Sequence, residues 1–281
     1  MKYGITAATG KFGKTAVETL LKTVDPTEIV AIVRNPEKAK QSLPKNIEIR
    51  QGDYTKLEQL EEAFQGIERL LFISSLPGGN YPRDKQHLNV VAAAKKAKVD
   101  YIAYTSFPHA DQATSVLSAD HRITEQALKD SGLTYSFLRN NWYLENQTDL
   151  IRSAQAGKPI YFSAADGQVG WALEKYYAQA AAKVLQLKQP KPVYEFAGAP
   201  HTFTELAKIA AKLSEKSAEI YQVSDAEYRE ILNKAGLQAA SEAIVMIQQL
   251  IRQGELAEKT SDLTDVLGQQ LPSLSESIQE I

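Results

Sequence analysis

The sequence contains no cysteine, which excludes disulfide bonds, thiolate metal ligands and a cysteine nucleophile. It also lacks an apolar run of about eighteen residues, the length that a membrane-spanning helix needs. The 32 basic and 34 acidic residues leave a net charge of -2, which argues against a dedicated nucleic-acid-binding protein. The opening stretch MKYGITAATG has no apolar core of a signal peptide. These absences predict a soluble cytoplasmic protein without a nucleic-acid or membrane partner.

Two classes of catalytic site are also missing. Four scattered histidines without any cysteine form no metal-binding cluster, so no metal is expected. No Gly-x-Ser-x-Gly motif is present, and hydrolase chemistry is therefore unsupported.

What is present, over about the first 140 residues, is an alternation of short apolar runs with helical patterns. Strands separated by helices predict a doubly wound parallel sheet of the Rossmann type. After about Asn146 the pattern changes to short strands and amphipathic helices, which predicts a smaller, mostly helical C-terminal lobe. We expect an NAD(P)-binding domain over residues 1–146 and a substrate-side lobe over residues 147–281. The two should interleave, because such lobes often return a strand to the main sheet.

A glycine-rich turn, ITAATGKFGK, directly follows the first strand and opens a helix near Lys11. This arrangement is typical of a dinucleotide-binding turn, in which the helix N-terminus faces the pyrophosphate. Gly10 and Gly13 are present, but Ala7 stands where such turns usually begin with glycine. An alanine is tolerated there if its φ is negative and is costly if φ is positive. The predicted phosphate-binding residues are Thr6, Ala7, Ala8, Thr9, Gly10, Lys11, Phe12 and Gly13.

The end of the second strand indicates the nucleotide. NAD-binding proteins usually carry an acidic residue there, about 20 residues after the turn, for the ribose 2′-hydroxyl. This chain has Arg34 instead, with Lys38 nearby, and an arginine pairs with a 2′-phosphate. The sequence therefore predicts NADPH rather than NADH. Asp53 is either an adenine contact or a turn cap, and Ser74 and Ser75 are expected on the ribose side.

Short-chain reductases carry their general acid in a Tyr-x-x-x-Lys pair on the helix after the fifth strand, and no such pair is found in that place. At that spacing the sequence has His121 and Glu125. Ser106, His109 and His121 are weak catalytic candidates, and each histidine is otherwise a bystander. A flat acceptor that takes hydride without a protein acid, such as a quinone or a conjugated cation, suits this composition. The residues that could stack on it, or that merely pack between lobes, are Phe107, Trp142, Tyr143 and Trp171.

Several segments together resemble the NmrA-like branch of atypical short-chain dehydrogenases, and within it quinone oxidoreductases of type 2 and triphenylmethane reductases. The resemblance is carried by ITAATGKFG, IVAIVRNPEKA, RQGDY, LLFISS, YIAYTSFPHAD, GLTYSFLRNNWYLEN, VYEFAG and LTDVLGQQLPSLSESI. It implies an NADPH-dependent quinone reductase without a Tyr/Lys pair. It also implies nicotinamide-end contacts by Ile73, Ser74, Ser75, Leu138, Arg139, Asn140, Asn141, Trp142 and Tyr143. Ala7 and the stretch around Trp171 depart from the family pattern.

One alternative from another class is a redox sensor that binds NADP(H) and signals to a protein partner with little turnover, as NmrA-like regulators do. A sugar-nucleotide epimerase would keep the fold but needs the Tyr/Lys pair. The physiological acceptor and the oligomeric state, including a homodimer, are left open by the sequence.

Overall fold

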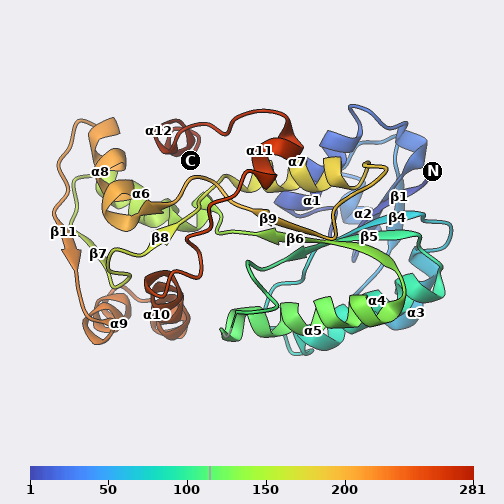
Figure 1. The fold of residues 1–281 in the computed structure, drawn as a ribbon, viewed down its shortest axis with the longest axis horizontal. Helices are drawn as coiled ribbons and strands as arrows, with labels where there is room; N and C mark the ends of the chain where they lie inside the picture. Colours follow the sequence, from blue (N-terminus) through green and yellow to red (C-terminus); the bar gives the residue numbers. More distant parts are fainter. Residues whose placement is uncertain (114) are drawn as a thin grey trace. The chain divides into compact units, whose positions relative to one another are not determined.

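The computed structural model describes residues 1–113 and 115–281, and the chain divides into two compact units (Figure 1). Unit 1 consists of residues 1–140, 174–196 and 262–268. Unit 2 consists of residues 141–173, 197–261 and 269–281. Segments far apart in the sequence therefore build each unit. The functional division into a cofactor domain and a substrate-side lobe stays a prediction.

Unit 1 is built on a seven-stranded sheet of order β3-β2-β1-β4-β5-β6-β9, in which all neighbouring strands are parallel. The strands are β1 (Tyr3–Ile5), β2 (Ile29–Val33), β3 (Glu48–Gln51), β4 (Arg69–Phe72), β5 (Tyr101–Ser106), β6 (Thr134–Asn140) and β9 (Val193–Phe196). All residues of β1, β2 and β5 are buried, as a sheet covered on both faces requires. The predicted Rossmann-type fold is confirmed.

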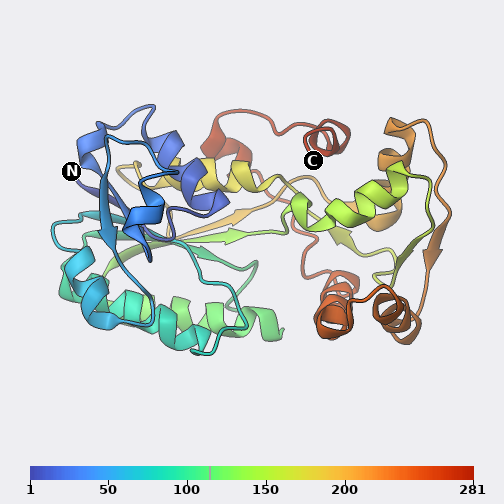
Figure 2. The ribbon, with the colours of Figure 1, turned by 180° about the vertical axis from the view of Figure 1, so that it is seen from behind.

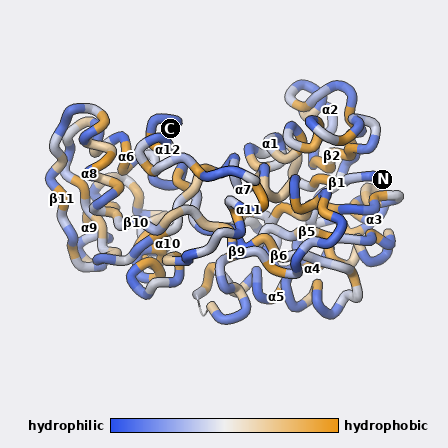
Figure 3. The backbone as a smooth tube through the Cα atoms, turned by 45° about the horizontal axis from the view of Figure 1, so that its top comes forward, coloured by the Kyte–Doolittle hydropathy of each residue, from blue (hydrophilic) through white to orange (hydrophobic). Residues whose placement is uncertain are grey.

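Helices cover both faces of this sheet (Figures 1 and 2). On one side lie α1 (Lys11–Leu20), α7 (Glu174–Val184) and α11 (Asp262–Leu267). On the other lie α3 (Leu57–Ala63), α4 (Arg83–Lys96) and α5 (Val116–Ser131), which pack on a buried apolar cluster. The short elements η1 (Pro26–Glu28) and α2 (Pro36–Ala39) complete the unit. Hydrophilic and hydrophobic residues alternate along α5, as expected for a helix with one buried face (Figure 3).

Unit 2 is mostly helical, as predicted. Its helices are η2 (Leu144–Gln147), α6 (Thr148–Gln155), α8 (Phe203–Leu213), α9 (Asp225–Lys234), α10 (Gln238–Arg252) and α12 (Leu274–Ile278). Two small sheets pair β7 (Ile160–Phe162) with β11 (Ile220–Gln222) and β8 (Gln168–Val169) with β10 (His201–Thr202). Capping boxes begin α8, α9 and α12. Within the described part of the chain, no helix is long and apolar enough to cross a membrane.

Candidate cofactor-binding site

The strand order reverses between β1 and β4, so the carboxyl ends of these strands form a topological switch point. Ligands of doubly wound sheets bind in the crevice at such a point. The glycine-rich turn follows β1 here, and residues 73–75 follow β4. The topology therefore places the predicted phosphate turn and Ser74 and Ser75 at one edge of the sheet.

The turn leaves the start of α1 without a cap. Gly10 is the N-cap residue, with φ −71°, and no side chain caps the helix. The N–H groups of the first helical turn have no acceptor within the helix, and the helix dipole makes this end electropositive. Ala7, Thr9, Gly10 and Lys11 are exposed. An uncapped, exposed helix N-terminus of this kind suits a pyrophosphate.

The two glycines of the turn have different tasks. A Cβ on Gly13 would lie 2.5 Å from Ala7 O and 2.7 Å from Ala8 Cα, so the helix packs against the turn through this position. A Cβ on Gly10 would meet only Ala7 O, at 3.5 Å, and would project into open space. Gly13 is thus required by the fold, whereas the fold leaves room for a methyl group at Gly10.

Ala7 has φ +48°, in the left-handed region. The sequence left the sign of this angle open. L-residues other than asparagine and aspartate rarely adopt this conformation, which glycine adopts without cost. The turn nevertheless closes, because Gly10 N–H donates to Ala7 O at 3.0 Å. Ala7 therefore keeps the backbone path of a glycine turn at the expense of local strain.

Arg34 follows β2 directly and is exposed, as is Lys38. Among the described residues, no acidic side chain forms an ion pair with either of them. Both cations are thus available to an anionic ligand at the end of β2. Asp53 follows β3, and its Oδ1 accepts hydrogen bonds from the Thr55 N–H at 2.9 Å and the Thr55 hydroxyl at 2.8 Å. Asp53 therefore caps this turn through Oδ1, and its predicted contact with adenine stays a prediction.

The segment after β4 is supported by buried side chains. Ile73 N–H donates to Thr6 Oγ1 at 2.9 Å, and Ser74 N–H donates to Thr105 Oγ1 at 2.9 Å. Ser75 N–H donates to Nε2 of His87 at 3.0 Å. Ile73, Ser74 and Ser75 themselves are half-buried, so one side of the segment faces outward.

Ser106 and Arg139 belong to one buried ionic network. The Ser106 hydroxyl donates to Glu125 Oε1 at 2.7 Å. Arg139 donates to both oxygens of Glu125, at 2.9 and 2.7 Å, and to Oε1 of Glu195 at 2.8 Å. These carboxylates hold the pKa of Arg139 above its ordinary value against the effect of burial. His109 lies beside Glu195, with Nδ1 3.6 Å from Oε1.

His121 belongs to a second network. Its Nε2 lies 3.1 Å from Nη2 of Arg83, and a guanidinium only donates, so Nε2 is the acceptor. The proton is therefore on Nδ1, which donates to the Tyr104 hydroxyl at 2.8 Å. Phe107 stacks on the His121 ring with centroids 6.0 Å apart. Burial, and after it the charge of Arg83, holds the pKa of His121 well below its ordinary value.

In unit 2 the chain continues from β6 through Asn141, Trp142 and Tyr143. The Asn141 side chain donates to Leu256 O at 3.1 Å and accepts from Trp142 N–H at 2.7 Å. Tyr143 forms a parallel bridge with Ala172, next to Trp171 in the chain. Trp171 packs edge-on against Phe203, and its buried Nε1 has no hydrogen-bond partner among the described residues.

The predicted acceptor residues are thus divided between the units. Unit 2 brings the Tyr143 segment beside the Trp171 segment, whereas Phe107 lies in unit 1 against His121.

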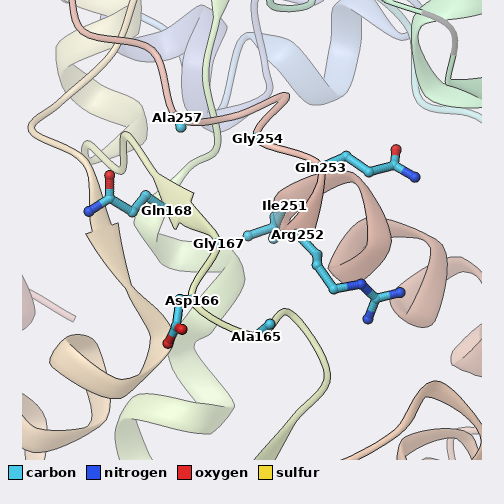
Figure 4. Close-up of a pocket in the computed structure, with 9 residues that line it drawn as sticks. All are labelled: Ala165, Asp166, Gly167, Gln168, Ile251, Arg252, Gln253, Gly254 and Ala257. Carbon is cyan, nitrogen blue, oxygen red and sulfur yellow. The ribbon is translucent and has the colours of Figure 1, made fainter.

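Unit 2 also has an open depression of about 460 Å³ between the C-terminal end of α10 and the turn before β8 (Figure 4). Arg252 at its rim is paired with Asp225 at 2.9 Å. Of the residues described, the lining set is Ala165, Asp166, Gly167, Gln168, Ile251, Arg252, Gln253, Gly254 and Ala257, which includes none of the predicted acceptor residues.

Residues 7–169 match the model of a family described as NAD(P)H-binding. The chain is also 38% identical over 280 residues to quinone oxidoreductase 2 of Escherichia coli (strain K12). The matched region covers 99% of this chain and 97% of that protein. The chain belongs to the NAD(P)H-binding family.

Two solved structures are similar over the full length. Citrobacter sp. triphenylmethane reductase complexed with NADP(H) superimposes with a TM-score of 0.93 at 33% identity, covering 100% of both chains. The NADPH-dependent quinone oxidoreductase of Escherichia coli complexed with NADPH also has a TM-score of 0.93, at 38% identity, covering 99% of both chains. The predicted relationship to NmrA-like oxidoreductases is confirmed, and so is a cofactor of the NAD(P)H class.

Sequence reasoning missed four residues whose side chains form hydrogen bonds to the backbone of residues 73–75, namely Tyr54, Arg83, His87 and Thr105. No motif marks them, because each lies within an ordinary strand, helix or turn pattern. Their common feature is a polar group in a buried position, which becomes visible only when the strands and helices are packed together.

Proposed function

We propose that this protein is an NADPH-dependent reductase that transfers hydride to a quinone-like or conjugated acceptor without a Tyr/Lys pair. The proposal is carried by two features at the same edge of the sheet. The helix after β1 begins without a side-chain cap, and Arg34 after β2 forms no ion pair with the described residues. Together these features fit a dinucleotide with a 2′-phosphate. The acceptors named for the similar proteins, quinones and triphenylmethane dyes, support the acceptor class.

In this proposal the turn from Thr6 to Gly13 holds the pyrophosphate, and Arg34 holds the 2′-phosphate. Residues 73–75 and 138–143 lie at the nicotinamide end. When bound, NADPH supplies the hydride. The protein binds and orients the reactants and limits the access of water.

The absence of a protein acid is part of the proposal. Glu125 stands where the lysine of the Tyr/Lys pair would be, and it is bound by Ser106 and Arg139. His121 stands at the tyrosine position and is enclosed by Tyr104, Arg83 and Phe107. An acceptor that is stable as an anion, or that starts as a cation, takes hydride without a proton from these groups. Ser106, His109 and His121 remain weaker candidates for a proton donor.

The test is NADPH consumption after addition of a simple benzoquinone, run beside NADH. We expect the wild type to oxidise NADPH with higher kcat/KM than NADH. Arg34→Ala should lower kcat/KM for NADPH by about tenfold or more, because a charge-assisted pair is lost, and leave NADH nearly unchanged. Lys22→Ala removes an exposed positive charge beyond the other end of α1 and should have no such effect.

No acceptor-dependent oxidation with any quinone or dye, despite tight NADPH binding, would contradict the reductase and favour the redox sensor. Equal use of NADH and NADPH by the wild type would contradict the role of Arg34. Assembly as a homodimer and a cytoplasmic location stay predictions.

A further inference from the structure

Strand β4 ends earlier than its neighbour. β4 pairs with β5 from Arg69 opposite Tyr101 to Phe72 opposite Tyr104, but β5 continues to Ser106 alongside β6. Residues 73–75, here called the β4 extension, leave the ladder although a partner strand is available to them. Five of the backbone groups of the extension are instead bonded by side chains.

Five side chains provide these bonds. Besides the three N–H groups already described, the Tyr54 hydroxyl donates to Ile73 O at 2.7 Å, and Nε of Arg83 donates to Ser75 O at 2.6 Å. The supporting residues come from the loop after β1, the turn before α3, strand β5 and helix α4. They are Thr6, Tyr54, Thr105, Arg83 and His87.

His87 is completely buried, and its hydrogen bonds define its tautomer. Nε2 accepts from Ser75 N–H, so the ring proton is on Nδ1. Nδ1 lies 2.8 Å from Thr124 Oγ1, whose own proton is directed to Asp120 O at 2.7 Å. The ring is therefore held from behind by α5 while it presents a single acceptor to the β4 extension.

We propose that His87 is a positioning residue, which with Thr105 holds the β4 extension in the place required at the nicotinamide end of the cofactor. The extension borders the switch point between β1 and β4, where the ligand crevice of such a sheet lies. It is half-buried, whereas His87 and Thr105 behind it are buried. Because side chains rather than β5 bond the extension, its backbone follows a path that pairing with β5 would not allow. This inference rests on the proposed function.

The experiment compares His87→Leu, which removes the acceptor, with His87→Gln, whose amide oxygen can replace Nε2. Thr105→Val and Thr105→Ser form a second pair, which removes or keeps the acceptor for Ser74 N–H. This pair tests the inference if His87→Leu does not fold. Ser136→Ala is the matched control, since it loses a buried hydrogen bond from its hydroxyl to Lys191 O but does not contact the extension.

Three quantities are measured: the emission spectrum of bound NADPH, which reports the surroundings of the nicotinamide, kcat with a benzoquinone, and the Kd for NADPH. For His87→Leu and Thr105→Val we expect emission displaced toward that of free NADPH and kcat lowered by about tenfold or more. The Kd for NADPH should change by less than about threefold, because the phosphate turn and Arg34 are intact. His87→Gln, Thr105→Ser and Ser136→Ala should resemble the wild type.

The inference is overturned if His87→Leu and Thr105→Val keep wild-type emission and kcat. It is also overturned if Ser136→Ala loses kcat and emission to the same extent, because the effect is then general destabilisation. Absence of turnover in the wild type would contradict the proposed function alone, and the emission spectra of the variants would still decide the positioning role.

Discussion

At the scale of single residues, the phosphate turn separates two demands on glycine. Gly13 has no room for a methyl group because Ala7 O and Ala8 Cα are 2.5 and 2.7 Å from the Cβ position. Gly10 has room within the protein but lies on the exposed face that a pyrophosphate would cover. Gly13 is therefore required for packing, whereas a role of Gly10 in binding stays a prediction.

This separation predicts different outcomes for two equal substitutions. Gly13→Ala should lower the free energy of unfolding by about 1–3 kcal/mol through overpacking against backbone. Gly10→Ala should change it by less than about 1 kcal/mol but weaken NADPH binding by about tenfold or more. Urea unfolding and NADPH titration measure the two effects. Tight NADPH binding by Gly10→Ala would show that the ligand does not approach this face.

The positive φ of Ala7 predicts that a glycine at this position would stabilise the protein. Ala7→Gly relieves a left-handed alanine and should raise the free energy of unfolding by up to about 1 kcal/mol, the unfolded-state entropy of glycine offsetting part of the relief. NADPH binding should be retained or tightened. Lys98→Gly, at φ +58° after α4, is the matched control, with a similar gain in stability and no change in binding. A loss of stability on Ala7→Gly would show that the angle is not strained.

At the scale of elements, helices α4 and α5 place two neutral histidines against the end of β5. Burial, with a smaller contribution from Arg83, lowers the pKa of His87 to about 3. In the unfolded chain a histidine has a pKa of about 6.5. Between these values the unfolded chain binds a proton that the folded chain does not, so stability falls as pH falls below about 6.5 and is fully present above it.

We therefore expect the free energy of unfolding to decrease by about 2 kcal/mol for His87 alone between neutral pH and about pH 5. His121 should add to this in the same direction, because its pKa is also lowered. Urea unfolding at the two pH values measures the loss, and His87→Gln should reduce it. An unchanged pH dependence in His87→Gln would mean that other groups cause the acid sensitivity.

At the scale of the whole molecule, unit 1 includes segments from the end of the chain. Helix α11 packs on α7 and β9, with Leu263 completely buried. Asp262 accepts from Glu195 N–H at 3.0 Å and pairs with Lys191 at 2.8 Å. Unit 1 thus includes a helix that lies more than 120 positions beyond β6.

Leu263→Ala should therefore destabilise unit 1 by about 2–5 kcal/mol, because a filled core position becomes a cavity. Leu187→Ala, at a position 39% exposed in the same unit, should cost much less. Thermal unfolding with and without NADPH measures both. If the unfolding step that NADPH stabilises is unchanged in Leu263→Ala, then α11 does not unfold cooperatively with the rest of unit 1.

The sequence predicted those features that follow from local rules. The alternation of apolar runs with helical patterns indicated the parallel sheet, which is confirmed. The glycine turn after Ile5 indicates a phosphate site, which stays a prediction. Arg34 and the lack of an acidic residue after β2 indicated NADPH. The sequence could not show that Glu125 binds Ser106 and Arg139, because these three residues lie on different elements.

By itself, then, the sequence determined the fold class and the NAD(P)H-binding class, since each depends on residue type and spacing along the chain. The tertiary structure alone decided the positive φ of Ala7, which results from closing the turn against α1. It also decided the addition of β9 and α11 to unit 1, and the side-chain support of the β4 extension. These depend on contacts between distant segments, where burial removes water and each polar group must find a partner in the protein.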